Sequence, residues 1–210
     1  ITGGPGTGKT TTLRLLLEIL DRAGAVKVKL ASPTGRAAKR LHEATGREAS
    51  TIHRLLGFDP ASGGFKHDGD EPLDLDYLVV DEVSMLDLQL AHDLLQAVPD
   101  RARVLFVGDA DQLLSVGPGA VLRDLVAIET VETTRLQRIH RQGEDSGIVE
   151  AAHAILHGEM PQSTTTADGR GDFFVSYRDD PEDAAELVER IIAERMPEKY
   201  EVDPKHDLLV

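Results

Sequence analysis

Hydrophobic residues along this chain follow two spacings that alternate. Short apolar runs typical of buried strands occupy residues 27–31, 77–81, 104–108, 173–177 and 207–210. Between such runs, leucines recur at the spacing of one helix face, namely Leu13, Leu16, Leu17 and Leu20, and later Leu86, Leu90, Leu94 and Leu95. Gly24 and Pro99 end these helical segments. Strands that alternate with helices are joined by right-handed crossovers, so the pattern predicts an α/β fold with a mainly parallel sheet and helices on both faces.

Polar segments and the chain ends complete this outline. Residues 59–71, rich in Gly, Asp and Pro, predict a surface loop or a small hairpin, and residues 161–171 predict another loop. A further helix is expected over residues 181–195. Ile1 and Val210 both lie in strand-like sequence, whereas the ends of a domain are usually exposed. We therefore expect a piece of a longer protein.

Composition narrows the class of protein. A chain of 210 residues with 40% hydrophobic content can build one well-buried core and part of a second. No apolar run approaches the roughly 20 residues of a membrane-spanning helix, and no secretory signal is visible. The absence of cysteine excludes disulfides and cysteine-based zinc sites. A cytoplasmic location without a membrane partner fits these features.

A glycine-rich segment carries the first chemical motif. Residues 3–10 read GGPGTGKT and match the phosphate-binding pattern G-x-x-x-x-G-K-[ST]. Glycines let backbone N–H groups surround phosphate, and the start of the following helix adds positive potential. Lys9 offers a charge to the outer phosphates, and Thr10 offers a hydroxyl to Mg²⁺. The residues expected to hold the nucleotide are Gly4, Pro5, Gly6, Thr7, Gly8, Lys9, Thr10 and Thr11. This motif alone does not separate a helicase from a kinase, a GTPase or a transporter ATPase.

Two adjacent acids follow the strand-like run at residues 77–81. The carboxyl ends of parallel strands share one edge of a sheet, so Asp81 and Glu82 should lie near the glycine-rich loop. Asp81 is expected to hold Mg²⁺, together with Thr10, and Glu82 to polarise the attacking water. A single acid here would more often be a helix cap. The pair favours hydrolysis over passive nucleotide binding.

A third strand-like run ends in the segment GDADQLLSV, residues 108–116. Gln112 can hydrogen-bond the γ-phosphate or its water and lose that bond on cleavage. It is therefore a candidate sensor of hydrolysis, although the segment could also be a polar turn.

Charge is distributed unevenly. The net charge of −14 disfavours nucleic acid on average, yet residues 36–54 hold five Lys or Arg against two acids, a local +3. An ordinary solvated helix face has this composition too.

The segments that carry chemistry follow one another along most of the chain. They are GGPGTGKTTT (3–12), LASPTGRAAKRL (30–41), STIHRLLG (50–57), YLVVDEVSMLD (77–87), VGDADQLLSVGPGAVL (107–122) and LQRIHRQ (136–142). This series resembles the motif series of superfamily 1 helicases, and its wording is most similar to the RecD family, the alpha subunit of exodeoxyribonuclease V. Pro33 favours the RecD branch, because UvrD-like relatives carry an aromatic residue there. Leu114 departs from the family, which commonly has proline, and so does His140, where an aromatic residue often precedes the arginine.

The resemblance implies a RecA-like P-loop NTPase. It implies a first RecA-like motor domain over residues 1–136, with its first strand truncated, and the truncated beginning of a second over residues 137–210. ATP hydrolysis between two such lobes would move the protein along single-stranded DNA, 5′ to 3′ in this branch, in DNA repair or recombination. Arg141 matches an arginine that reaches the γ-phosphate from the second lobe. The family's DNA-contacting positions correspond to Pro33, Thr34, Arg36, Thr51 and His53.

Several alternatives stay open at this level. The helicase module of a conjugative relaxase shares much of this motif set. A non-catalytic nucleotide-binding regulatory subunit is a second alternative. Such a subunit would not need the whole set of Lys9, Asp81, Glu82, Gln112 and Arg141. The sequence does not decide between a stand-alone helicase and a subunit with nuclease or helicase partners. Without the later family motifs, these residues alone should hydrolyse ATP poorly.

Overall fold

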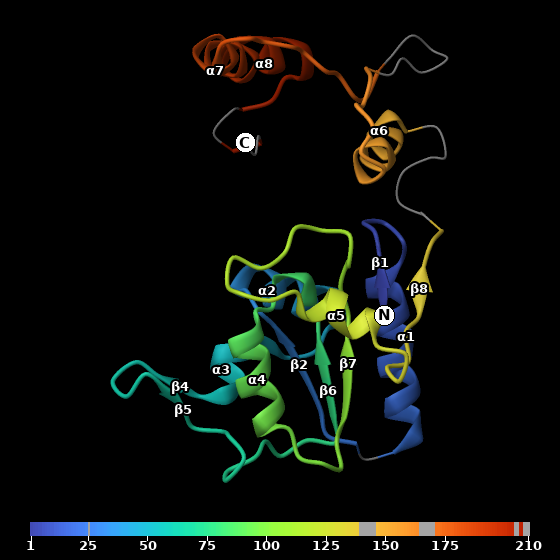
Figure 1. Cartoon of the computed structure of the whole chain (residues 1–210), viewed down its shortest axis with the longest axis vertical. Coiled ribbons are helices and arrows are strands. Elements are labelled where there is room, and N and C mark those ends of the chain that lie inside the picture. The colour runs from blue at the N-terminus through green and yellow to red at the C-terminus, as the bar shows by residue number, and fades with distance from the viewer. Residues whose placement is uncertain (25, 139–145, 164–170, 204–205, 208–210) are drawn as a thin grey trace. The chain divides into compact units, whose positions relative to one another are not determined.

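The computed structural model describes residues 1–24, 26–138, 146–163, 171–203 and 206–207. The chain divides into two compact units, Ile1–Glu144 and Asp145–Val210 (Figure 1).

A parallel sheet forms the centre of the first unit. Its strands lie in the order β3-β2-β6-β7, and all neighbouring pairs are parallel. The bounds are Val28–Ser32 for β2, Ala49–Thr51 for β3, Tyr77–Val80 for β6 and Arg103–Phe106 for β7. β1 (Thr2–Gly3) pairs in parallel with β8 (Arg135–Leu136) and bridges to Gly108, just beyond β7. The three strands predicted in the first half of the chain and their parallel arrangement are confirmed.

Helices cover both faces of this sheet (Figure 1). On one face, α1 (Lys9–Ala23) and α2 (Gly35–Thr45) contribute Leu13, Leu17 and Leu41 to a cluster with strand residues Leu30, Val79 and Val107. On the other face, α3 (Ile52–Leu56), α4 (Leu88–Ala97) and α5 (Val121–Ala127) pack against a cluster that includes Ala31, Leu78 and Val80. Adjacent strand residues thus serve opposite faces, which explains why β6 is apolar throughout rather than alternating.

Short elements join these layers. A 3₁₀ turn, Val83–Met85, follows β6, and the Asp87 side chain accepts a hydrogen bond from Leu90 N (2.8 Å) at the start of α4. The segment predicted as a loop or small hairpin forms the hairpin β4 (Phe58–Asp59) and β5 (Gly64–Phe65), which projects from the first unit (Figure 1).

The second unit is helical in its described residues. It contains α6 (Gly147–Leu156), α7 (Pro181–Arg190), a π-helix (Ile191–Arg195) and α8 (Met196–Tyr200). The helix predicted over residues 181–195 is confirmed, with its last turn widened. The strand predicted at residues 173–177 is wrong: this segment has no regular structure, and Phe174 is 68% exposed. An apolar run becomes a strand only beside a partner, and none lies beside this one among the described residues. Most of the strand predicted at residues 207–210 lies outside the described residues.

Across the described ranges, every helix is too short or too polar to pass through a bilayer.

Candidate nucleotide site

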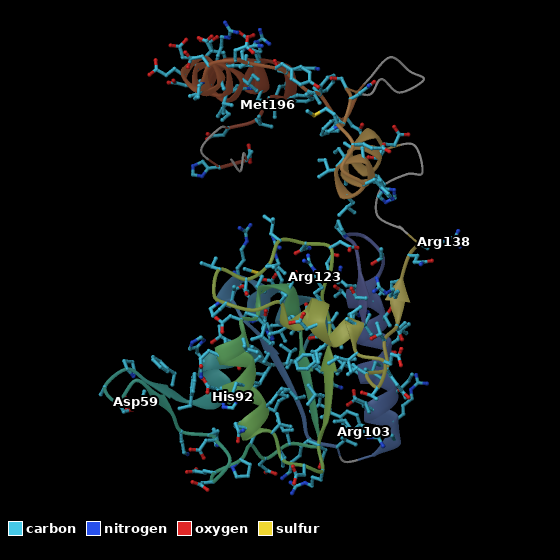
Figure 2. All side chains as sticks on the ribbon, viewed as in Figure 1. Asp59, His92, Arg103, Arg123, Arg138 and Met196 are labelled. Carbon is cyan, nitrogen blue, oxygen red and sulfur yellow. The ribbon has the colours of Figure 1, made fainter. Side chains whose placement is uncertain are left out.

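The predicted nucleotide-site residues of the first unit, other than Arg141, lie at the carboxyl edge of the sheet. In Figure 2, Arg103 at the start of β7 marks the amino end of the sheet, and Arg123 in α5 lies at the opposite end. The loop between β1 and α1 lies at this second end, as do the residues that follow β2, β6 and β7. Parallel pairing therefore brings together segments that are far apart in the sequence.

The glycine-rich loop is held by its own side chains. Lys9 Nζ donates hydrogen bonds to Gly3 O (2.6 Å) and Gly4 O (3.0 Å), and Thr7 Oγ1 donates to Gly4 O (2.8 Å). Gly8 has φ +90°, a left-handed conformation that glycine adopts without strain. The Lys9 ammonium is thereby fixed against the loop.

The first turn of α1 lacks a side-chain cap. Its N-cap residue is Gly8, whereas α2, α3 and α4 are capped by the side chains of Thr34, Thr51 and Asp87. An uncapped helix start leaves N–H donors to be satisfied by water or ligand. Phosphate is the ligand that suits such a start when glycines precede it.

Asp81 and Glu82 leave β6 through a strained turn. Asp81 N donates to Ala31 O (2.9 Å), which continues the pairing of β6 with β2 by one residue. Glu82 then adopts φ +55°, uncommon for a residue with a side chain. Such strain costs about 1–3 kcal/mol and is concentrated at functional sites. The strained residue is thus one of the two predicted acids, directly after Asp81 at the edge of the sheet.

The pKa of Asp81 depends on its burial and on the charges of two other candidate residues, Glu82 and Lys9. The pKa of the Asp81 carboxyl is raised, mainly by burial and further by the negative charge of Glu82. The hydrogen bond from Glu82 N and the positive charge of Lys9 act in the opposite direction and lower this pKa. Asp81 therefore interacts with both Glu82 and Lys9. A partly buried carboxylate with a raised pKa is typical of a site completed by a ligand.

The donor set fits a magnesium nucleotide better than a protein-only metal site. No group of three or more His, Cys, Asp or Glu side chains suited to a metal occurs in the described ranges. Mg²⁺ is usually held by one or two carboxylates together with phosphate oxygens and water. Asp81 and the exposed Thr10 supply hard oxygen ligands of this kind, beside a loop suited to phosphate.

Gln112 lies just beyond β7 and is exposed. Ser84 Oγ is 3.4 Å from Gln112 Oε1, a long hydrogen bond that links the turn after β6 to the segment after β7. Ser84 was not predicted as a site residue from the sequence. Its only signal was its place two residues after Glu82.

The residues expected to contact DNA also follow paired strand ends. Ser32 at the end of β2 pairs with Thr51 at the end of β3, so Pro33 and Thr34 start from the same edge as Thr51. Thr34 Oγ1 accepts from Ala37 N and Thr51 Oγ1 from Arg54 N, both at 3.2 Å, so each hydroxyl hydrogen is left to donate.

Two of the expected DNA contacts differ in their surroundings. The Arg36 side chain is exposed in the first turn of α2. The His53 ring packs against the hairpin, with centroids 5.6 Å from Phe58 and 5.7 Å from Phe65. Sequence spacing did not predict this aromatic cluster. Arg141 and His140 lie outside the described residues.

The fold and the loop together define a P-loop NTPase. Residues 1–118 match the family model described as AAA domain, and the chain belongs to that family as a RecD-like member of the superfamily 1 helicases. The resemblance stated from the motifs is thereby confirmed.

The chain matches only part of the length of each of two curated relatives. The chain is 49% identical over 161 residues to the ATP-dependent RecD2 DNA helicase of Deinococcus radiodurans, spanning 77% of this chain and 22% of the relative. It is 39% identical over 205 residues to the RecBCD enzyme subunit RecD of Mycolicibacterium smegmatis, spanning 86% of this chain and 37% of the relative. The chain thus spans between about a fifth and somewhat more than a third of the length of these relatives.

Among solved structures, the Pif1 helicase from Candida albicans aligns with a TM-score of 0.53 at 23% identity, over 76% of this chain and 40% of that one. At this identity the likeness concerns the fold, and it confirms an α/β RecA-like architecture.

Proposed function

We propose that this chain is the ATP-binding core of a DNA helicase motor, in which ATP hydrolysis drives movement along single-stranded DNA. The observation that carries the proposal is that the glycine-rich loop and the end of β6 lie at the same edge of the sheet (Figure 1), where the charges of Lys9 and Glu82 both act on Asp81. The RecD-like family supports DNA as the track. In that branch movement is 5′ to 3′, which we propose for this protein as well.

Each nucleotide-site residue has a proposed role. Lys9 holds the outer phosphates, and the loop N–H groups hold the rest of the triphosphate. Thr10 and Asp81 hold Mg²⁺, which when bound neutralises charge that develops on the phosphates. Glu82 orients and polarises the attacking water, because a carboxylate accepts its proton.

Two further residues respond to the γ-phosphate in this proposal. Gln112 loses a hydrogen bond when the phosphate is cleaved, and Ser84 moves with it through their contact. Arg141 reaches the γ-phosphate from the second lobe, since a guanidinium stays charged and offers several donors. Nucleotide state would then control the opening of the two lobes.

The DNA track is proposed to run over the ends of β2 and β3. Thr34, Thr51 and Arg36 contact the phosphate backbone there, which agrees with the local positive charge of residues 36–54. His53 joins them through the aromatic cluster with Phe58. Bases stack on aromatic rings regardless of sequence, so this cluster suits single-stranded DNA.

The domain assignment belongs to the same proposal. Residues 1–136 form the first RecA-like motor domain, and residues 137–210 begin the second. A cytoplasmic protein acting with nuclease or helicase partner subunits fits this proposal. One relative is named as a subunit, the RecBCD enzyme subunit RecD.

A comparison of ATPase rates tests the function. In the full-length protein, single-stranded DNA should raise the rate of ATP hydrolysis at least tenfold, because only a DNA-bound motor aligns both lobes. Lys9→Ala should abolish the rate with and without DNA, and this control identifies the activity as belonging to the site. Equal rates in the presence and absence of DNA would remove the helicase proposal and leave a nucleotide hydrolase.

A further inference from the structure

The buried hydroxyl of Ser32 has no role in the functions proposed above. Ser32, the last residue of β2, is 0% exposed, and its Oγ has no hydrogen-bond partner among the described residues. Buried side-chain oxygens are almost always hydrogen-bonded, because an unpaired one loses its bonds to water without replacement. An exception next to a ligand site indicates a group that is satisfied when the ligand binds.

Strand register places Ser32 beside Asp81. In the pairing of β2 with β6, Leu30 is opposite Val79 and Ala31 is opposite Val80. Asp81 N donates to Ala31 O (2.9 Å), so this parallel pairing continues beyond the end of β6. The next pair is Ser32 with Asp81, on backbones about 4.8 Å apart.

Both side chains emerge on the face that carries the nucleotide loop. Leu30 and Val79 pack with Leu13 of α1, the helix that follows the loop. Ser32 and Asp81 lie two residues beyond Leu30 and Val79, and residues two apart in a strand share a face. The Ser32 hydroxyl therefore neighbours the carboxylate proposed to hold Mg²⁺, on the side from which the nucleotide would approach.

We propose that Ser32 is a positioning residue for the metal-binding carboxylate. Its Oγ–H donates to one oxygen of Asp81 once the magnesium nucleotide is bound, after rotation of either side chain. The other Asp81 oxygen would then be free to hold Mg²⁺. Hydrogen bonds of this kind orient metal ligands, and their loss commonly weakens metal affinity or activity about 10–100-fold. This inference rests on the proposed ATP and Mg²⁺ site.

The test compares Ser32→Ala with Ser32→Thr in the full-length protein. Ser32→Thr keeps the hydroxyl. Ser62→Ala is the control, because it removes an exposed hydroxyl that donates to Asp59 in the hairpin turn (2.9 Å) and has no proposed role in the site. The first measurement is the rise in thermal unfolding temperature on adding a non-hydrolysable ATP analogue, with Mg²⁺ or with a chelator. The second is the Mg²⁺ concentration at half-maximal ATP hydrolysis.

Ser32→Ala should lose most of the Mg²⁺-dependent part of the temperature shift and keep the part seen with chelator. The half-maximal Mg²⁺ concentration should rise about tenfold, with kcat at saturating Mg²⁺ within a few-fold of the unmodified protein. Ser32→Thr should restore both values, and Ser62→Ala should change neither. Without ligand, Ser32→Ala should unfold at the same or a higher temperature, because it removes an unpaired hydroxyl.

Two results separate the possible failures. An unchanged Mg²⁺ midpoint in Ser32→Ala, with or without a lower ligand-free unfolding temperature, would overturn the role of Ser32 and leave the ATP site intact. No Mg²⁺-dependent stabilisation in the unmodified protein would instead overturn the proposed nucleotide site itself.

Discussion

Charged side chains at the two ends of the central sheet differ in whether they form ion pairs with one another. At the amino end, Lys27 Nζ lies 2.5 Å from Asp74 Oδ2, and Arg101 lies within 4.0 Å of both Asp74 and Asp76. Lys27 N also donates to Asp76 Oδ2 (2.9 Å). The hydrogen bond from Lys27 is the main reason that the pKa of Asp74 is lowered. These groups are exposed and satisfied by one another.

At the carboxyl end, neither Asp81 nor Glu82 forms an ion pair with another of the described residues. Asp81 is partly buried with a raised pKa, Glu82 is held in a left-handed conformation, and the Ser32 hydroxyl is unpaired. The same strands supply both ends, so the difference does not come from the sheet itself. The contrast supports the proposal that charge at the amino end serves the fold, while charge at the carboxyl end serves the proposed nucleotide site.

The largest expected effect separates hydrolysis from binding at the carboxyl end. Glu82→Gln keeps the size of the side chain and removes the group that accepts a proton from water. We expect kcat for ATP hydrolysis to fall about 10²–10⁴-fold, while ATP binding stays within a few-fold. Single-turnover hydrolysis and titration with a fluorescent ATP analogue measure the two quantities. Glu71→Gln, in the loop before β6, is the control and should leave both unchanged; a near-normal kcat in Glu82→Gln would assign the water to another residue.

A smaller effect is expected where DNA phosphates are proposed to bind. Arg36→Ala removes an exposed guanidinium after β2, so affinity for single-stranded DNA should fall several-fold. The slope of log affinity against log salt should flatten by about 0.7, as for one phosphate contact on a single strand. Lys39→Ala is the matched control, because Lys39 lies in the same helix and pairs with Glu43 at 3.8 Å. If the slope of log affinity against log salt is the same in Arg36→Ala and Lys39→Ala, residues 36–54 are an ordinary solvated surface and not a DNA-binding one.

A third change tests the partly buried charge of Asp81 directly. The pKa of Asp81 is raised above its ordinary value of 3.8 in the folded state, so folding weakens as pH rises through that raised pKa. Asp81→Asn should therefore unfold at a higher temperature than the unmodified protein near pH 7 without ligand. This advantage should vanish as pH falls below about 4. Thermal unfolding followed by circular dichroism between these pH values provides the measurement; a variant that is less stable at pH 7 would contradict the contrast between the two ends.

The smallest effect is expected at the amino end, with the opposite sign. Asp74 has a lowered pKa, so it stabilises the fold above its unfolded value of 3.8, and this contribution is lost as pH falls through its folded pKa. Asp74→Asn should slightly lower the unfolding temperature near pH 7 and match the unmodified protein in acid. High salt should reduce the difference, because exposed pairs are screened. If Asp74→Asn instead raises the unfolding temperature near pH 7, as expected for Asp81→Asn, the proposed difference between the two ends of the sheet is wrong.

Local patterns in the sequence were sufficient for much of the first unit. The glycine-rich motif specified its own loop, because Lys9, Thr7 and Gly8 act within a few residues of one another. β6 was recognisable as a buried strand from its unbroken apolar run. The same rule failed at residues 173–177, since apolar character does not supply the neighbouring strand that a sheet requires.

Other features depended on contacts between distant residues. His53 was expected at the DNA surface from family resemblance, yet its packing against Phe58 and Phe65 required the hairpin to fold back. Ser84 acquired its link to Gln112 only because β6 and β7 are neighbours. No spacing within one segment encodes such pairs.

The sequence by itself determined the class of fold, the phosphate loop and the twin acids, because each depends on residues that are adjacent in the chain. Only the tertiary structure decided which strand lies beside which. This order of strands makes Ser32 a neighbour of Asp81 and brings Lys9 close enough to act on the charge of Asp81. The physical reason is strand register: hydrogen bonds between parallel strands join residues dozens of positions apart, and a shift of one residue would turn Ser32 to the other face.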